Sequence, residues 1–373
     1  MSIAYAPDRQ ATPPLHRRPI RLMVVDDSMV ARAVLSRMIE ASGEFEIVAV
    51  AGTGEDAIKA LSHVRVDVIM LDLEMPGAGG LKSIPGIIKA ARGARVLIVS
   101  SLAEEGAEAT VQALAMGAAD TLPKPGTGRF NGRFSEILIE KLRGLGRESE
   151  SALPKASLVA TAEGAHPIDP SLLRKMGEGP VRLLALGAST GGIHALTEFF
   201  QALPAEIGAP ILVTQHLPAP FMAVFARQLG NAAGREAIVA EEGLRVLPDR
   251  IVIAPGDANL TVDIHAGSLI IRLDRQRATS GCLPSVDPMF ASAGALLGRD
   301  ALGVVFSGMG RDGLEGSMHL SGVGGSILVQ DEASSAVWGM PRAVAEAGLA
   351  GGVHPPAEIA RRIGHRIREA TCR

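Results

Sequence analysis

The strongest constraint on the fold is an alternation of short β-branched runs with segments whose apolar residues recur at helical spacing. In the first half of the chain these runs are RLMVVDD, FEIVAVA, VDVIMLD, ARVLIVS and ADTLPKP. The rhythm returns in the second half in VRLLALGAST, APILVTQHLP, EAIVAEE, ALGVVFSG and SILVQD. Repeated βα units predict doubly wound parallel sheets covered by helices. Ligands of such sheets bind at the carboxyl ends of the strands, so functional residues are expected there.

A chain of 373 residues is long for one domain and long enough to form two. Residues 1–18 lack the apolar core of a signal peptide and contain several prolines, which predicts a disordered leader. Residues 19–146 form the first domain, with a (βα)5 pattern. Residues 147–178 mix Ser, Ala, Pro and charges without a sustained period, which predicts a linker. Residues 179–373 form the second domain.

The second domain is predicted to be a mostly parallel, doubly wound α/β sheet with an antiparallel insert. The insert is expected in residues 250–274, where short alternating runs are separated by Gly, Asp and Asn.

Composition excludes several classes of protein. Apolar residues make up 47% of the chain, which allows sizeable cores and argues against global disorder. The net charge of −3 argues against a nucleic-acid partner. No apolar stretch approaches the ~18–20 residues of a membrane span, so no membrane insertion is expected. The two cysteines, Cys282 and Cys372, form neither a disulfide framework nor a zinc motif by their spacing, which fits a cytoplasmic protein.

Acidic residues gather at the predicted strand ends of the first domain. Asp26 and Asp27 close the first strand and Asp72 closes the third, while Ser100 ends the fourth and Lys124 follows the fifth. Clustered carboxylates repel one another, so a divalent cation is their natural partner. A lysine opposite them would neutralise phosphate oxygens or the carboxylates themselves. The alternative, that Asp27 caps the following helix, does not explain Asp72 and Lys124 together.

This pattern resembles the receiver domain of two-component response regulators, over about Pro19 to Gly146. The resemblance implies that Asp72 accepts a phosphoryl group and that Ser100 and Lys124 sense it. It also implies an Mg²⁺ ion held by Asp26, Asp27, Asp72 and the backbone carbonyl of Glu74.

The second domain carries a serine and a histidine at successive strand ends. GASTG matches the G-x-S-x-G turn around Ser189, and His216 ends the next apolar strand. A small-residue βα turn is also compatible with phosphate binding or helix capping. The Rossmann fingerprint needs glycine where Ser189 stands, and a Walker A loop needs a GK[ST] sequence that is missing. The position of His216 therefore favours nucleophilic catalysis.

A catalytic triad also needs an acid, and Asp257, Asp287 and Asp312 are candidates. Asp312 is preferred because VVFSGMGRDG places it after a strongly apolar strand, among glycines. Asp287, in PSVDP, has an alternative role as a helix cap. The backbone amides of Met309 and Thr190 are candidates for stabilising an oxyanion.

Six motifs follow the receiver-like segment in a fixed order: GASTGG, TQHLP, IAPGD, PSVD, SGMGRDG and WGMPR. Together they resemble the CheB family of chemotaxis protein-glutamate methylesterases, over nearly the whole chain beyond the leader. The resemblance implies Ser189 as nucleophile, His216 as base, Asp312 as the orienting acid and Met309 as an oxyanion donor, with no metal in the catalytic site. The segment before PSVD reads SGCL here, where the family often has a basic or aromatic run.

The resemblance also implies substrates and partners. The expected activity is hydrolysis of glutamate methyl esters on chemotaxis receptors, with deamidation of selected glutamines. A histidine kinase of the chemotaxis type is the expected phosphodonor. The receiver is predicted to cover the catalytic cleft until Asp72 is phosphorylated.

Two alternatives from other classes remain. One is a binding adaptor whose serine site has decayed, which the intact Ser189, His216 and Asp312 argue against. The other is a transcriptional regulator, which the absence of a recognisable helix-turn-helix and a basic face argues against.

Overall fold

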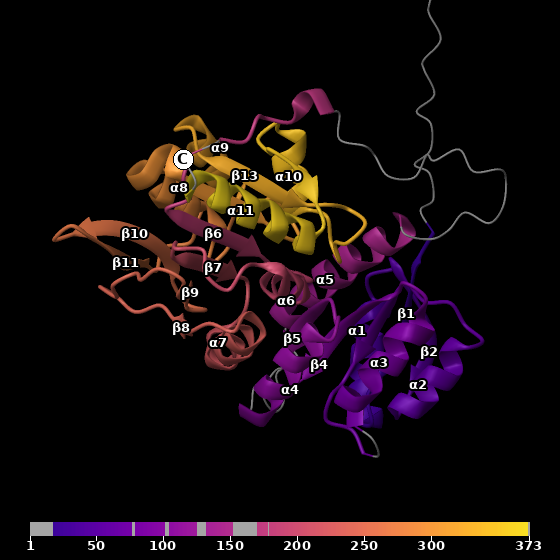
Figure 1. Ribbon diagram of the computed structural model, residues 1–373. Coiled ribbons are helices and arrows are strands. Elements are labelled where there is room, and N and C mark those ends of the chain that lie inside the picture. Colours follow the sequence, from indigo (N-terminus) through magenta and orange to yellow (C-terminus); the bar gives the residue numbers. More distant parts are fainter. Residues whose placement is uncertain are drawn as a thin grey trace, which may run out of the picture.

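The computed structural model describes residues 18–76, 79–100, 104–124, 132–151, 170–177 and 179–371. The predicted leader, apart from its last residue, and most of the predicted linker lie outside these ranges. The chain forms two α/β domains, each built on a parallel sheet (Figure 1). None of the helices in the described ranges is both long and apolar enough to cross a bilayer.

The first domain has a five-stranded parallel sheet in the order β2-β1-β3-β4-β5. The strands are β1 (Ile20–Val25), β2 (Phe45–Ala51), β3 (Val68–Leu71), β4 (Arg95–Ser100) and β5 (Asp120–Pro123). The helices are α1 (Met29–Glu40), α2 (Gly54–Leu61), α3 (Gly79–Ala91), α4 (Glu104–Ala115) and α5 (Gly132–Ser151). Helices α1 and α5 cover one face of the sheet, and α2, α3 and α4 cover the other. The predicted doubly wound (βα)5 fold is confirmed.

The second domain has a seven-stranded parallel sheet in the order β14-β13-β12-β6-β7-β9-β8. Its strands are β6 (Leu183–Ala188), β7 (Ile211–Gln215), β8 (Ala237–Val239), β9 (Ile251–Ile253), β12 (Ala301–Val305), β13 (Ser326–Gln330) and β14 (Val353–His354). The chain winds outward from β6 in both directions, so the strand order reverses between β6 and β12. Such a reversal opens a crevice at the strand ends, where ligands of doubly wound sheets bind.

Helices cover both faces of this second sheet. One face packs on α6 (Gly192–Ala202), α7 (Ala219–Ala233) and α11 (Pro356–Thr371). The other packs on α8 (Val286–Leu297), α9 (Leu314–Gly322), α10 (Met340–Glu346) and the hairpin of β10 (Asn259–His265) and β11 (Ser268–Asp274). Two short 3-10 helices, Pro170–Leu172 and Gly298–Asp300, complete the domain.

The structure refines several predictions. An antiparallel hairpin is present in the insert, but the first run of that stretch is β9, a buried parallel strand of the main sheet. The sequence pattern missed β14 and α11. Helix α5 continues to Ser151, into the predicted linker. At the far end of that linker, the backbone amides of Arg174 and Gly177 donate to Ala350 and Ser326 of the second domain.

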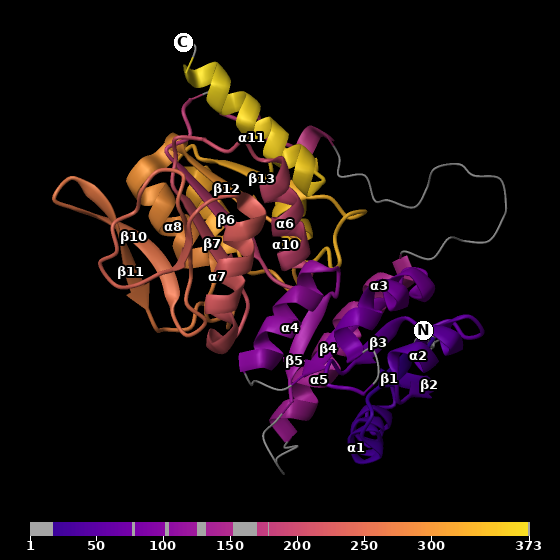
Figure 2. The same cartoon turned by 60° about the horizontal axis from the view of Figure 1, so that its bottom comes forward.

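The two domains share a continuous apolar core. Figures 1 and 2 show α4 and β5 of the receiver lying against α6 and α7 of the second domain. Buried side chains of α4, including Val111 and Leu114, belong to the same cluster as Ile193 of α6 and Phe221 of α7. The receiver therefore packs on the second domain through the edge that carries its last two strands.

Candidate active site and phosphorylation site

Ser189 stands in the turn between β6 and α6. Its amide donates to the carbonyl of Ser307, 3.0 Å away, which ties this turn to the end of β12. Gly191 has φ of +78°, a left-handed conformation that favours glycine, and it starts α6. A Cβ on Gly308 would lie 2.8 Å from the Cβ of Ser189, so glycine there makes room for the serine. The strand-end turn thus presents the hydroxyl at the crevice between β6 and β12.

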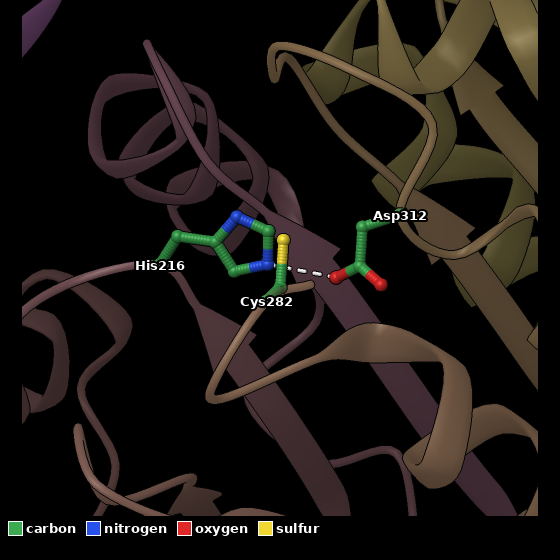
Figure 3. A group of neighbouring side chains, drawn as sticks. All are labelled: His216, Cys282 and Asp312. Carbon is green, nitrogen blue, oxygen red and sulfur yellow. Dashed lines mark hydrogen bonds and ion pairs between the residues drawn. The ribbon is translucent and has the colours of Figure 1, made fainter. Parts of the chain in front are cut away.

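His216 directly follows β7, the strand that pairs with β6 on the other side. The amide of His216 donates to the carbonyl of Ala188, which places its imidazole beside the serine turn. Nδ1 of His216 lies 3.1 Å from Oγ of Ser189. Nε2 lies 2.7 Å from Oδ2 of Asp312 (Figure 3). The three side chains therefore form one hydrogen-bonded row, as triad chemistry requires.

Among the three candidate acids, Asp312 alone contacts His216 within the described residues. Asp257 pairs at 3.5 Å with Arg275 on the surface. Asp287 lies in the first turn of α8 and accepts a hydrogen bond from the amide of Gly316. Burial, together with the charge of Asp312, raises the pKa of Asp287 to about 7.

The electrostatics of the row favour a carboxylate beside a protonated imidazole. Burial alone would lower the pKa of His216, but hydrogen bonds to Asp312 and Cys282 outweigh it and raise the pKa to about 9. Burial raises the pKa of Asp312, but hydrogen bonds from His216, Ser285 and the amide of Val286 outweigh burial and hold this pKa below its usual range. His216 is therefore a strong base oriented by a permanent anion.

The two candidate oxyanion donors flank the serine. Backbone amides of Thr190 and Met309 have no hydrogen-bond partner among the described residues. Met309 follows Gly308, which packs on Ser189, and Thr190 is the next residue along the turn. Two unpaired amides beside a serine hydroxyl can stabilise an oxyanion.

Sequence reasoning missed the residues that hold these groups in place. The hydroxyls of Ser280 and Ser285 donate to Oδ1 of Asp312 at 2.9 and 2.6 Å. Gln215 donates to the carbonyl of Ser189, and Ser307 donates to the carbonyl of Thr190. Gln215, Ser285 and Ser307 lie in the motifs TQHLP, PSVD and SGMGRDG, although the motifs did not reveal these contacts, whereas Ser280 lies outside the motifs.

The acidic site of the receiver forms at the reversal between β1 and β3. Carboxylate oxygens of Asp26, Asp27 and Asp72 lie within 4.8 Å of one another. Nζ of Lys124 lies 2.9 Å from Asp26 and 2.6 Å from Asp72. Burial raises the pKa of Asp72 despite the lysine, and the two carboxylates raise the pKa of Lys124 despite its burial. One ammonium among three carboxylates leaves negative charge uncompensated, so the residues present fit a divalent cation.

The loop at Glu74 and the start of helix α1 border this site. The amide of Glu74 donates to Oδ1 of Asp72, which orders the loop whose carbonyl was predicted as a metal ligand. Helix α1 is capped by Ser28, whose hydroxyl accepts from the amide of Ala31. Asp27 is thus exposed and does not cap α1.

Ser100 lies at the end of β4 and is fully buried. Its hydroxyl is 2.6 Å from the hydroxyl of Thr110 on α4. The side chain of the predicted phosphate-sensing serine is therefore bonded to the helix that packs on the second domain, while its carbonyl accepts a hydrogen bond from the backbone amide of Lys124 at 2.8 Å.

The receiver covers the serine site directly. The hydroxyl of Thr190 donates to Asp120 at 2.6 Å, and the amide of Gly191 donates to the carbonyl of Ala119 at 2.6 Å. The side chain of Met309 packs against Gly144 of α5. Both candidate oxyanion residues are therefore held by the receiver.

Little space is left beside the nucleophile. A cavity of about 10 Å³ lies between Ser189, His216 and Gln215 on one side and Leu114 and Asp120 of the receiver on the other. Such a volume holds about one water molecule, so a glutamyl side chain does not fit in this arrangement.

The sequence matches two family models. Residues 184–363 match the CheB methylesterase family, and residues 22–129 match the response regulator receiver domain. A protein-glutamate methylesterase/protein-glutamine glutaminase 2 of Caulobacter vibrioides is 40% identical, over 94% of this chain and 99% of its own length. The protein of that name numbered 1 in Paramagnetospirillum magneticum is 36% identical, over 91% and 94%. That of Azospirillum brasilense is 37% identical, over 91% of each chain. The chain therefore belongs to the CheB family of protein-glutamate methylesterases/protein-glutamine glutaminases, with a receiver domain in front of the methylesterase domain.

Proposed function

We propose that the chain hydrolyses glutamate methyl esters, and deamidates selected glutamines, on chemotaxis receptors through Ser189, His216 and Asp312. The observation that carries this proposal is the row from Oγ of Ser189 through the imidazole of His216 to Asp312, with spacings of 3.1 and 2.7 Å. The relatives' names supply the substrate class. Glutamate esters are small, so the site needs only a narrow cleft beside the serine.

The hydrolysis proceeds in two steps. Oγ of Ser189 attacks the ester carbonyl carbon while Nδ1 of His216 takes the hydroxyl proton. The amides of Thr190 and Met309 stabilise the oxyanion. The C–O bond to the methoxy group breaks, and methanol leaves with the proton from His216. Water then attacks the glutamyl-enzyme with the same base, which releases the carboxylate and restores Ser189. A glutamine amide follows the same path and releases ammonia.

Asp312 orients the imidazole throughout. It accepts from Nε2 of His216, which leaves the lone pair of Nδ1 facing the serine. Hydrogen bonds from Ser280, Ser285 and the amide of Val286 fix the carboxylate in this position. Its negative charge stabilises the imidazolium that forms when Ser189 attacks.

The receiver inhibits the site in the arrangement described. Asp120 and Ala119 bind the residues after Ser189, and α5 packs on Met309, so substrate access and the oxyanion donors are controlled together. Phosphorylation of Asp72 by a histidine kinase of the chemotaxis type would add about −1.5 to −2 charges beside Lys124. Mg²⁺ held by Asp26, Asp27, Asp72 and the Glu74 carbonyl would neutralise the phosphoryl oxygens. Drawing Ser100 toward the phosphoryl group breaks its bond to Thr110 and loosens α4 from the second domain.

The test is methanol release from methylated receptor, measured with and without a small-molecule phosphodonor in the presence of Mg²⁺. The wild-type chain is expected to release methanol slowly alone and faster with the phosphodonor. Asp72→Asn is expected to keep the slow rate and lose the stimulation. A wild-type chain that releases no methanol in either condition would refute the activity. Stimulation of equal size in Asp72→Asn would refute the proposed control.

A further inference from the structure

Cys282 brings a thiol to the triad that the hydrolytic mechanism does not use. It lies in a turn before α8, in which Gly281 donates to the carbonyl of Ala278 and Ala278 donates to the carbonyl of Cys282. Sγ of Cys282, a ring nitrogen of His216 and a carboxylate oxygen of Asp312 all lie within 4.8 Å of one another. Figure 3 shows the thiol beside the edge of the imidazole that faces Asp312.

These three groups are a donor set for a borderline-soft cation. Thiolate sulfur, imidazole nitrogen and carboxylate oxygen are the ligands of Zn²⁺ in proteins, at roughly 2.0–2.3 Å from the metal. Nε2 of His216 and Oδ2 of Asp312 are hydrogen-bonded at 2.7 Å, so these two atoms must move slightly apart to hold one ion between them. Ligand atoms of a tetrahedral zinc site lie roughly 3.3–3.7 Å from one another, as those bond lengths require. Binding of the ion also requires Sγ of Cys282, which lies within 4.8 Å of the other two ligand atoms, to approach them by rotation of its side chain.

The surroundings hold the carboxylate in the way that metal sites require. Asp312 is buried and accepts hydrogen bonds from Ser280, Ser285 and the amide of Val286. Such partners fix the orientation of metal ligands. His216 and Cys282 are partly exposed, so an ion can reach the cluster from solvent.

We propose that His216, Cys282 and Asp312 form a site for Zn²⁺ or a cation of similar softness, and that its occupation stops ester hydrolysis. The inhibition of ester hydrolysis rests on the proposed function, whereas the binding of the metal does not. A water molecule would fill the fourth position of the metal.

Inhibition follows from the placement of the two ring nitrogens of His216, because Nε2 faces Asp312 and Nδ1 faces Ser189. In the neutral ring that acts as base, the proton sits on Nε2 and Nδ1 accepts the proton of Ser189. A metal on Nε2 displaces that proton, and the neutral ring then carries its proton on Nδ1. Nδ1 becomes a donor toward Ser189 and can no longer take its proton. The thiol of Cys282 loses its proton to solvent as the sulfur–metal bond forms.

The same chain thus holds two cation sites of different chemistry. The cluster of Asp26, Asp27 and Asp72 offers only oxygen, which suits Mg²⁺. The cluster at His216 adds nitrogen and sulfur, which favour Zn²⁺ or Co²⁺ over Mg²⁺. Excess Mg²⁺ therefore occupies the first site and leaves the second free for a softer metal.

The binding test uses Co²⁺ as a spectroscopic probe on the full chain, in excess Mg²⁺. A Co²⁺–thiolate bond gives a charge-transfer band that an oxygen-only site cannot give, and competition with Zn²⁺ measures the zinc affinity. Cys372→Ala, which removes the other cysteine, is expected to keep the band. Cys282→Ala and Cys282→Ser are expected to lose the band and to bind Zn²⁺ at least about 100-fold more weakly. A missing band in the wild type, or an unchanged band in both Cys282 variants, would overturn the site.

The activity test compares each protein with its own metal-free rate of methanol release. Zn²⁺ is expected to inhibit the wild type and Cys372→Ala in parallel with occupancy, and a zinc-selective chelator is expected to restore the rate. The Cys282 variants are expected to need at least about 100-fold more Zn²⁺. Equal inhibition of the Cys282 variants, or zinc binding without inhibition, would refute the claim that metal at this site inhibits hydrolysis. If the metal-free wild type released no methanol, the proposed function would fail, and the Co²⁺ band would still decide the metal site.

Discussion

The hydroxyl of Thr190 donates a hydrogen bond of 2.6 Å to Asp120, which joins the residue after Ser189 to the receiver. Asp120 also pairs with Lys141 of its own domain at 2.7 Å, so its charge is compensated inside the receiver. A hydrogen bond to a charged group is commonly worth about 1.5–3 kcal/mol. This contact therefore forms a substantial part of the restraint on the serine turn.

Asp120→Ala is expected to raise methanol release in the absence of a phosphodonor by about 10-fold, because the lost hydrogen bond is worth about 1.5 kcal/mol or more. The matched control is Asp67→Ala. Asp67 is another buried receiver aspartate, paired with Arg21 at 3.0 Å, and its hydrogen bonds to Arg21 and Arg95 lie within the receiver. Equal rates in the two variants would show that the Thr190 contact does not restrain the site.

Gly144→Ala is expected to raise the same basal rate several-fold. A Cβ on Gly144 would collide with the end of the Met309 side chain, so that side chain must move and its packing on the helix is disturbed. Gly132→Ala is the control on the same helix, because a Cβ there meets nothing within 4 Å. The basal rate should stay constant in Gly132→Ala, and an unchanged rate in Gly144→Ala would contradict the role given to this contact.

Asp312→Asn is expected to lower kcat of the phosphorylated enzyme by about 10⁴-fold, as loss of an orienting carboxylate does in serine hydrolases. His216 must be neutral to act as base, so activity falls as pH falls through its pKa. The carboxylate of Asp312 helps to raise that pKa to about 9. In Asp312→Asn the acid limb of the pH–rate profile should therefore move to lower pH. An acid limb at the same pH in both proteins would argue against the pairing.

Ser285→Ala is expected to lower kcat by about 10-fold or more with little change in KM, because the hydroxyl donates to Asp312 at 2.6 Å and positions it. Ser317→Ala is the control. The hydroxyl of Ser317 is buried in α9 and has no hydrogen-bond partner among the described residues. A loss confined to KM, or an equal loss in Ser317→Ala, would leave Ser285 with a purely structural role.

The sequence predicted the fold well where each βα unit carries its own pattern. Strands such as Leu183–Ala188 and Ile211–Gln215 are continuous apolar runs, and the residues that follow them meet at one edge of the sheet. That rule alone brings Ser189, His216 and Asp312 together. It failed at Ile251–Ile253, since a short buried strand and a hairpin strand look alike in a run of three residues.

The contacts between the domains could not be predicted in the same way. The bond from Thr190 to Asp120 and the packing of Met309 on Gly144 depend on the docking of two separate folds, which leaves no periodic signal in either sequence. The hydrogen bond from Ser280 to Asp312 is equally hard to predict, because serines are common in turns, and the PSVD motif marked Ser285 without revealing that Asp312 is its partner.

The most direct test of the account is methanol release from methylated receptor by Ser189→Ala, assayed beside the wild type with Mg²⁺ and a phosphodonor. Circular dichroism of both proteins checks that the fold is kept. The account predicts a loss on the order of 10⁴-fold or more in Ser189→Ala, because the attacking hydroxyl is gone. A correctly folded Ser189→Ala that releases methanol at a rate near that of the wild type would contradict it.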